Sequence, residues 1–176
     1  MHHKNEQNGN SDIFKGLAAG LIGGLVGTIV MTQYQNIVTQ IGKSANGDDK
    51  KEKKKEEGGE NAPVKIAEAI SETVFDHKLK KSEKEQAGNA VHYVFGTTVG
   101  ALYGAAAEAI PATAIGYGLP FGTALFIGAD EVAVPALGLS EPPTEIPMTT
   151  HAYALSSHLV YGLTADLVRR AVRKYI

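Results

Sequence analysis

The residues of this sequence that could carry chemistry are histidines and carboxylates placed within or beside long apolar stretches. They are His92, Glu108, Asp130, Glu131, His151, His158 and Asp166. Ionisable side chains inside membrane-spanning segments are energetically expensive, and they normally face a bundle interior or water. Because imidazole exchanges protons near neutral pH, an interior set of histidines and carboxylates would suit a path for protons or small ions.

Two helical stripes contain most of these residues. Counting in fours gives the first stripe, which we expect to occupy one helix face: Gly88, His92, Gly96, Gly100, Gly104 and Glu108. The opposite face of that helix is apolar and aromatic: Val91, Val94, Phe95, Val99, Leu102 and Tyr103. Spacings of seven, four and four give the second stripe: His151, His158, Gly162 and Asp166. The two stripes could face each other across a bundle.

Structural roles are the alternative for each of these groups. The four carboxylates and His151 lie near predicted helix ends, where they can reach lipid headgroups. A buried histidine is also more often a hydrogen-bonded bundle residue than a ligand. Axial haem ligation by His92 and His158, or a His/carboxylate metal site, is a further alternative, but no diagnostic spacing such as H-E-x-x-H occurs. We predict no bound cofactor or metal, no catalytic residue and no enzyme activity, since nucleophile and phosphate-loop motifs are also missing from the sequence.

The average composition hides two populations of residues. The 176-residue chain has a mean hydropathy of -0.11, but the segment 42–86 carries 11 lysines and 11 acidic residues. Four other stretches lack Lys, Arg, Asp and Glu: 16–42, 86–107, 109–129 and 146–165. Most run about 20 residues, which is what a bilayer core of ~30 Å requires at about 1.5 Å per helical residue.

These patterns predict an all-α fold, a polytopic membrane bundle of four transmembrane helices within one domain. The predicted spans are about 13–41, 83–108, 112–137 and 149–173. A charged, partly disordered insert at 43–62 and a short amphipathic helix at 63–80 separate the first two. This helix lies on the membrane surface or, as an alternative, packs on nothing. Ser82-x-x-Glu85 is interpreted as a capping box. Gly116, Gly118 and Pro120 predict that the third span is kinked near Leu119 or begins late.

Glycine spacing predicts how these helices pack. The residues assigned to packing are Gly16, Gly20, Gly24, Gly27, Gly96, Gly100, Gly104 and Gly162. An interior glycine costs a helix in water about 1 kcal/mol relative to alanine, whereas in a bilayer a small stripe lets another backbone come close. The motif H-x-V-aromatic-G-x-T occurs at 92–98 and at 158–164, which suggests a two-helix internal repeat.

Three stretches carry a resemblance to a known family: HYVFGTTVGALYG (92–104), YGLPFGTALFIGADEVAVPALGLS (117–140) and HAYALSSHLVYGLTADLVRR (151–170). They resemble the bacterial inner-membrane family of unknown function typified by YagU. The resemblance implies a multi-pass inner-membrane protein with a link to acid tolerance. The resemblance does not identify any catalytic residue in this sequence.

The predicted topology suggests an orientation in the membrane, and the net charge bears on the choice of binding partner. Four spans put both termini on one side, and the C-terminal Arg/Lys cluster with Lys15 suggests that this side is cytoplasmic; the acidic 138–148 loop agrees, while the Lys-rich 43–86 loop does not. The net charge of -2 gives no case for nucleic acid. We expect the lipid bilayer as partner, with a homo-oligomer or another membrane protein as a further candidate.

The leading functional hypothesis is handling of protons or small solutes, or a contribution to acid tolerance, through the interior histidines and carboxylates. One alternative is a structural or assembly subunit that binds another membrane protein through its glycine faces. A haem- or metal-binding bundle is the other alternative.

Overall fold

The computed structural model describes residues 2–46 and 61–176, and over these residues the chain is helical and contains no strand. The all-α prediction is therefore confirmed. The elements in chain order are α1 (His2–Asn46), α3 (Ala62–Phe75), α4 (Lys81–Ala109), the 3₁₀ turn η2 (Pro111–Ala114), α5 (Leu119–Leu125), the π-helix η3 (Phe126–Ala133), α6 (Val134–Ala136), the 3₁₀ turn η4 (Pro143–Glu145) and α7 (Met148–Arg173).

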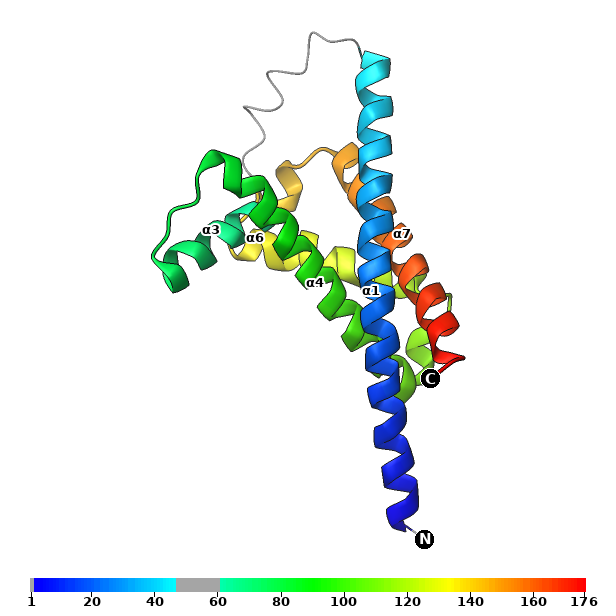
Figure 1. Cartoon of the computed structure of the whole chain (residues 1–176). Coiled ribbons are helices and arrows are strands. Elements are labelled where there is room, and N and C mark those ends of the chain that lie inside the picture. The colour runs from blue at the N-terminus through cyan, green and yellow to red at the C-terminus, as the bar shows by residue number, and fades with distance from the viewer. Residues whose placement is uncertain (1, 47–60) are drawn as a thin grey trace.

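The long helix α1 is the element on which the others assemble (Figure 1). Helices α4 and α7 both pack against α1, α3 packs against α4, and α5 packs against α7. Helices α4 and α7 both run antiparallel to α1. The N-terminal end of α1 and the C-terminal end of α7 therefore lie towards the same end of the molecule. We call this end the terminal end, and the opposite end the loop end.

Two segments are long and apolar enough to cross a membrane by length and composition: Ser11–Gly42 within α1, and Leu119–Ala136, which runs continuously through α5, η3 and α6. The spans predicted at 83–108 and 149–173 coincide with the helices α4 and α7, but their crossing of a membrane stays a prediction.

The third predicted span, 112–137, begins as an α-helix only at Leu119. The interrupting glycines and proline predict a late start as one of two possibilities. Gly116, Tyr117 and Gly118 all have positive φ, at 78°, 54° and 80°. Glycine adopts this conformation readily, but Tyr117 does so against a steric cost. The chain therefore turns over these three residues before α5 can start.

Other predicted boundaries are corrected. The amphipathic helix ends at Phe75 and not at residue 80, because Asp76 adopts the left-handed conformation that caps it. Helix α4 then begins at Lys81, and the carboxylate of Glu83 accepts a hydrogen bond from the backbone N–H of Lys80 at 2.8 Å. The predicted capping box at Ser82 and Glu85 is therefore wrong by two residues. Helix α1 extends beyond the predicted 13–41 at both ends, and residues 47–60 of the predicted 43–62 insert lie outside the described residues.

Glycines mark the places where helix backbones meet. A Cβ atom on Gly20 of α1 would lie 2.7 Å from the Cα of Gly104 in α4, and one on Gly24 would lie 2.9 Å from the Cα of Gly100. Real Cβ atoms essentially never approach other atoms this closely. We call this contact the α1–α4 seam, and its members are Gly16, Gly20, Gly24, Gly96, Gly100 and Gly104.

A second close approach joins α5 to α7. A Cβ atom on Gly162 would lie 3.0 Å from the Cα of Gly122, and one on Gly118 would lie 2.9 Å from the Cβ of Asp166. Gly27 instead faces the ring of Tyr161, 3.1 Å from where its Cβ would stand. A Cβ atom on Gly23 of α1 would also lie 3.3 Å from the carbonyl carbon of Ala165 in α7, so helix backbones meet closely at three contacts in the bundle.

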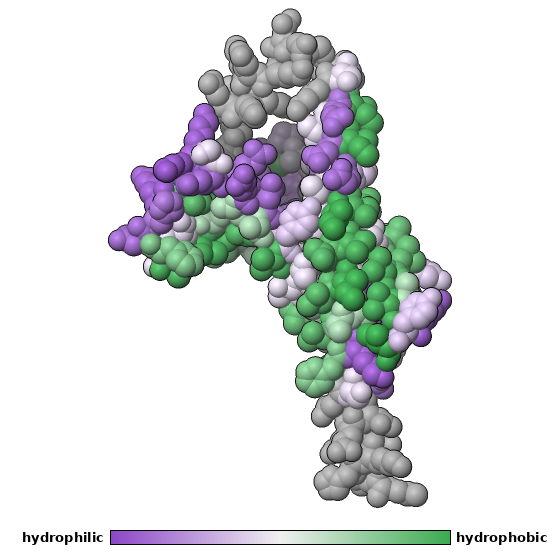
Figure 2. Space-filling model, in the orientation of Figure 1, coloured by the Kyte–Doolittle hydropathy of each residue, from purple (hydrophilic) through white to green (hydrophobic). Residues whose placement is uncertain are grey.

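Large apolar side chains lie mainly on the outside. Phe14 is 72% exposed, and Leu21, Ile22, Leu25 and Ile29 of α1 are each about two-fifths exposed. The described core is small and consists of Met31, Tyr161 and Ala165 with Phe121 and Leu125 against them. Figure 2 shows the result on one face of the molecule as a green apolar belt, with purple polar surface above it and a smaller purple patch at its lower margin.

Candidate functional site

The π-helix η3 places two consecutive carboxylates, Asp130 and Glu131, against α7. Its register is visible in the N–H of Val134, which bonds the carbonyl of Ala129 five residues earlier. Pro135 gives a local cause, because it has no N–H to offer Glu131 four residues before it and its ring would crowd that carbonyl. Such π segments are rare and occur frequently at functional sites.

Glu131 pairs with His151 near the loop end of α7. The Nδ1 atom of His151 lies 2.6 Å from Oε1 of Glu131, and its Nε2 atom lies 3.0 Å from the carbonyl oxygen of Pro143. A carbonyl can only accept, so Nε2 carries a proton and donates to Pro143. The 2.6 Å contact then needs one further proton between Nδ1 and the carboxylate. The His151–Glu131 pair therefore holds an exchangeable proton.

His158 lies two turns deeper on the same face of α7 and is 8% exposed. Its Nδ1 atom lies 3.0 Å from the carbonyl of Ala154 and 3.6 Å from Oδ2 of Asp130. The first contact fixes a proton on Nδ1, and the second is an electrostatic contact beyond hydrogen-bond length. The ring of Phe126 lies against the imidazole, with the ring centroids 5.9 Å apart.

His92 of α4 completes this deeper polar layer. Its Nε2 atom is buried and has no hydrogen-bond partner among the described residues, and His158 is its ionisable neighbour. A buried polar nitrogen without a partner is unusual in a folded protein and indicates a site that a water molecule or a small solute can satisfy.

A separate ionic network closes the terminal end of the bundle. Asp166 of α7 is 0% exposed; its Oδ1 accepts from Nε and Nη2 of Arg169 at 2.9 and 2.8 Å, and its Oδ2 accepts from Nε of Arg170 at 2.5 Å. Arg173 donates to Glu108 of α4 at 3.0 Å and to Asp12 of α1 at 2.8 Å. The network thus ties α1, α4 and α7 together.

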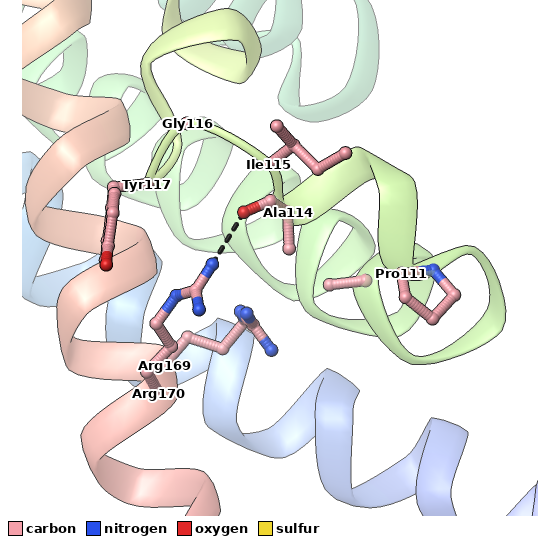
Figure 3. A pocket seen from close by; sticks show the side chains of 8 residues that line it. Pro111, Ala114, Ile115, Gly116, Tyr117, Arg169 and Arg170 are labelled. Atoms are coloured by element: carbon pink, nitrogen blue, oxygen red, sulfur yellow. Dashed lines mark hydrogen bonds between the residues drawn. The ribbon is translucent and has the colours of Figure 1, made fainter.

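The turn before α5 adjoins this network and forms an open pocket of about 480 Å³ between η2 and α7. Figure 3 shows the guanidinium groups of Arg169 and Arg170 reaching into it, with Nη2 of Arg170 donating to the carbonyl of Ala114 at 2.6 Å. The same guanidinium lies 4.9 Å from the ring centroid of Tyr117. Both arginines are bonded to Asp166, and Nη1 of Arg169 lies 3.6 Å from Oε1 of Glu108, so two carboxylates face the two guanidinium groups of the pocket wall.

Aromatic side chains fill the space between the deeper polar layer and the ionic network. Tyr103 stacks on Phe121 with centroids 4.1 Å apart, and Phe121 lies 6.0 Å from Tyr161. Tyr161 donates to the carbonyl of Gly96 at 2.6 Å, which joins α7 to α4. The hydroxyl of Tyr103 is buried beside Asp166.

The prediction that 88–108 presents one continuous face holds only in part. Gly96, Gly100, Gly104 and Glu108 all meet α1, where Glu108 packs on Gly16 and also accepts from Arg173 of α7, but Gly88 meets Val64 of α3. A step of four residues advances about 40° beyond a full helical turn, so five such steps rotate the stripe by about 200°. Tyr103 is buried for the same reason, although it was assigned to the opposite face.

The second stripe is correct in membership, but its partner is different from the one expected. His151 and His158 face η3, while Gly162 and Asp166 face the start of α5. The two stripes therefore do not face each other across the bundle. The structure instead groups the seven candidates into a loop-end pair, a deeper layer and a terminal-end network.

The arginines and the tyrosines are the members that sequence reasoning missed. In the sequence, the arginines were interpreted only as part of the C-terminal cluster that suggests a cytoplasmic side. A signal for their pairing was available in the i, i+3 and i, i+4 spacing of Asp166 to Arg169 and Arg170. Among the described residues, no group of three or more histidines and carboxylates is arranged to hold a metal ion.

Comparison with known protein families gives one match to this chain. Residues 54–167 match the family described as "Protein of unknown function (DUF1440)". The match spans α3 to most of α7, so it includes both carboxylates of η3 and both histidines opposite them. No curated protein and no solved structure matches the chain.

Proposed function

This chain belongs to the DUF1440 family, and we propose that it is a multi-pass protein of a bacterial inner membrane that takes up protons through its paired histidines and carboxylates. The proposed spans are α1, α4, the continuous α5–η3–α6 segment and α7. The proposal includes a contribution to acid tolerance.

The exterior of the bundle supports a lipid environment. Large apolar side chains of α1 lie outside while glycine backbones meet inside, which is the distribution expected when lipid and not water is the solvent. The glycine seams then act as packing surfaces, because small residues let two helices approach without a clash. The resemblance of 92–104, 117–140 and 151–170 to the YagU-type inner-membrane family supports the same location.

The observation that carries the proton hypothesis is the His151–Glu131 pair. Its two contacts, at 2.6 and 3.0 Å, require a shared proton, and its position near the loop end allows exchange with water through side chains that are about one-fifth exposed. His158, with Asp130 beside it, lies seven residues further along α7, about 10 Å deeper at 1.5 Å per residue. Imidazole and carboxylate groups in such a series are the usual components of membrane proton relays.

Reconstitution in liposomes with a trapped pH-sensitive dye tests this function. We expect wild-type protein to pass protons under an imposed potential and His158→Ala to lose that flux. The matched control is His77→Ala, because His77 is exposed in the turn between α3 and α4 and lies outside the polar layers. A wild-type protein that passes neither protons nor small ions would remove the hypothesis.

The assembly alternative is less favoured by the geometry. The glycine faces that would bind another membrane protein are occupied within the chain, since the glycines of α1 meet α4 and α7. Co-purification of a stoichiometric partner in mild detergent would reverse this preference.

The haem hypothesis has one specific observation in its favour. The Nε2 atom of His92 is buried without a partner near His158. An absorption spectrum of the purified protein tests it directly, because a bis-histidine haem would give a Soret band.

A further inference from the structure

We propose that α3 is an interfacial helix that rests its outward apolar face on the bilayer surface at the loop end, among anionic headgroups. The inference rests on the proposed membrane location of the bundle but not on proton transfer. It assigns a partner, the lipid surface, to a helix that projects sideways from the bundle (Figure 1).

Contacts with the bundle fix the orientation of α3. Val64, Ala67 and Ser71 are buried against α4, where Val64 fills the space left by Gly88. Glu68 forms an ion pair with Lys84 of α4. The Nζ atom of Lys65 donates to the carbonyl of Leu139 at 2.8 Å, which holds α3 to the segment after α6. The helix therefore cannot turn its other faces inward.

An apolar face remains uncovered after this docking. Ile70 is 45% exposed and Val74 is 68% exposed, and Phe75, which ends the helix about 100° further round, is 71% exposed. Ile70 and Val74 are one turn apart and share a face with Ile66, whereas Glu72 stands on the opposite side. Lys78, Lys80 and Lys81 follow on exposed positions at the outer tip. An apolar face beside exposed lysines is typical of helices that lie in a bilayer interface.

The position of α3, which projects from the bundle as an arm, indicates that lipid covers its apolar face. Figure 2 shows polar surface along the upper side of the arm and apolar surface along its underside, which faces down the molecule beside the green belt of the bundle. A bilayer around the belt would therefore meet the apolar underside of α3, while the polar side would stay in water. The lysines at the tip are then within reach of headgroup phosphates.

The chain contains no tryptophan, so a single introduced tryptophan reports on one position without background. The test uses full-length Val74→Trp and Glu72→Trp, reconstituted in vesicles of phosphatidylcholine with or without phosphatidylglycerol. The two positions are both exposed and lie about 200° apart around the helix. The substitutions leave the residues docked on α4 unchanged.

We expect the Val74→Trp emission to shift to shorter wavelength and to be quenched by lipids brominated on their acyl chains. We expect Glu72→Trp to be quenched by aqueous iodide instead. The brominated-lipid quenching of Val74→Trp should be stronger with phosphatidylglycerol, and this gain should be lost when Lys78, Lys80 and Lys81 are changed to Gln.

Equal iodide quenching at both positions, in protein that floats with the vesicles, would overturn the proposal for α3 and leave the membrane location intact. Protein that fails to float with the vesicles would overturn the membrane location itself. Quenching of Val74→Trp that is independent of lipid charge would overturn the role of anionic headgroups.

Discussion

The close contact between α1 and α4 leads to an unusual prediction. A glycine-to-alanine substitution should destabilise the bundle at Gly100, within the α1–α4 seam, and stabilise it at Gly128, outside the seam. A Cβ atom on Gly100 would lie 2.8 Å from the carbonyl oxygen of Gly20 and 2.8 Å from the backbone nitrogen of Gly24. Ordinary van der Waals contact begins at 3.4 Å, so α1 and α4 must separate. A Cβ atom on Gly128 of η3 would meet nothing within 4 Å.

The expected magnitudes follow from two opposing effects. Overpacking a close contact costs about 1–3 kcal/mol, and both partners at Gly100 are backbone, which places the cost near the upper end. Alanine regains about 1 kcal/mol of helix propensity. Gly100→Ala should therefore destabilise the bundle by about 1–2 kcal/mol, whereas Gly128→Ala should stabilise it by about 0.5–1 kcal/mol.

Thermal unfolding in mild detergent, followed by far-UV circular dichroism, measures both effects. If this chain follows the scaling for 150–250 residues, about 2–4 °C per kcal/mol, Gly100→Ala should lower Tm by about 2–8 °C and Gly128→Ala should raise it by about 1–4 °C. A Gly100→Ala protein that melts at or above the wild-type temperature would refute backbone contact between α1 and α4.

Three further predictions concern the polar groups. Asp166→Asn should destabilise the protein by about 3–5 kcal/mol, because it leaves buried guanidinium groups without their carboxylate, while Asp12→Asn, at a half-exposed carboxylate, should cost under about 1 kcal/mol in the same melt. His158→Ala should abolish the proton flux into dye-loaded liposomes that His77→Ala retains. Glu131→Gln should slow that flux, since the amide cannot accept the shared proton; an unchanged initial rate of dye response would remove this carboxylate from the path.

Helix positions were predictable because charge-free stretches and turn residues mark them directly. The late start at Leu119 followed from glycines and a proline that local chemistry explains. The π register of η3 was not predicted, although Pro135 carries the signal, because the missing N–H acts on a carbonyl four residues earlier. The boundary at Asp76 depends on a left-handed residue that is not glycine, and such residues have no strong sequence signature.

The grouping of the candidate residues was not predictable from the sequence. Counting in fours placed Gly88 and Glu108 on one face, but the helix rotates enough for Gly88 to meet α3, while Glu108 meets both α1 and α7. The Asp12–Arg173 contact joins residues at the two ends of the chain. Such a pair depends on how three helices pack, which local spacing does not specify.

The polar layers also decide what kind of proton chemistry this conformation can support. His158 and Asp166 are eight residues apart on α7, about 12 Å along the axis at 1.5 Å per residue, and the rings of Tyr103, Phe121 and Tyr161 occupy the space between them. A proton that enters at the loop end therefore reaches an aromatic barrier before the ionic network. Conduction through the bundle requires a second arrangement of α5 on α7, whereas proton uptake alone does not. Proton flux in the liposome assay would thus show that this barrier opens, and its absence would remove the proton-handling hypothesis.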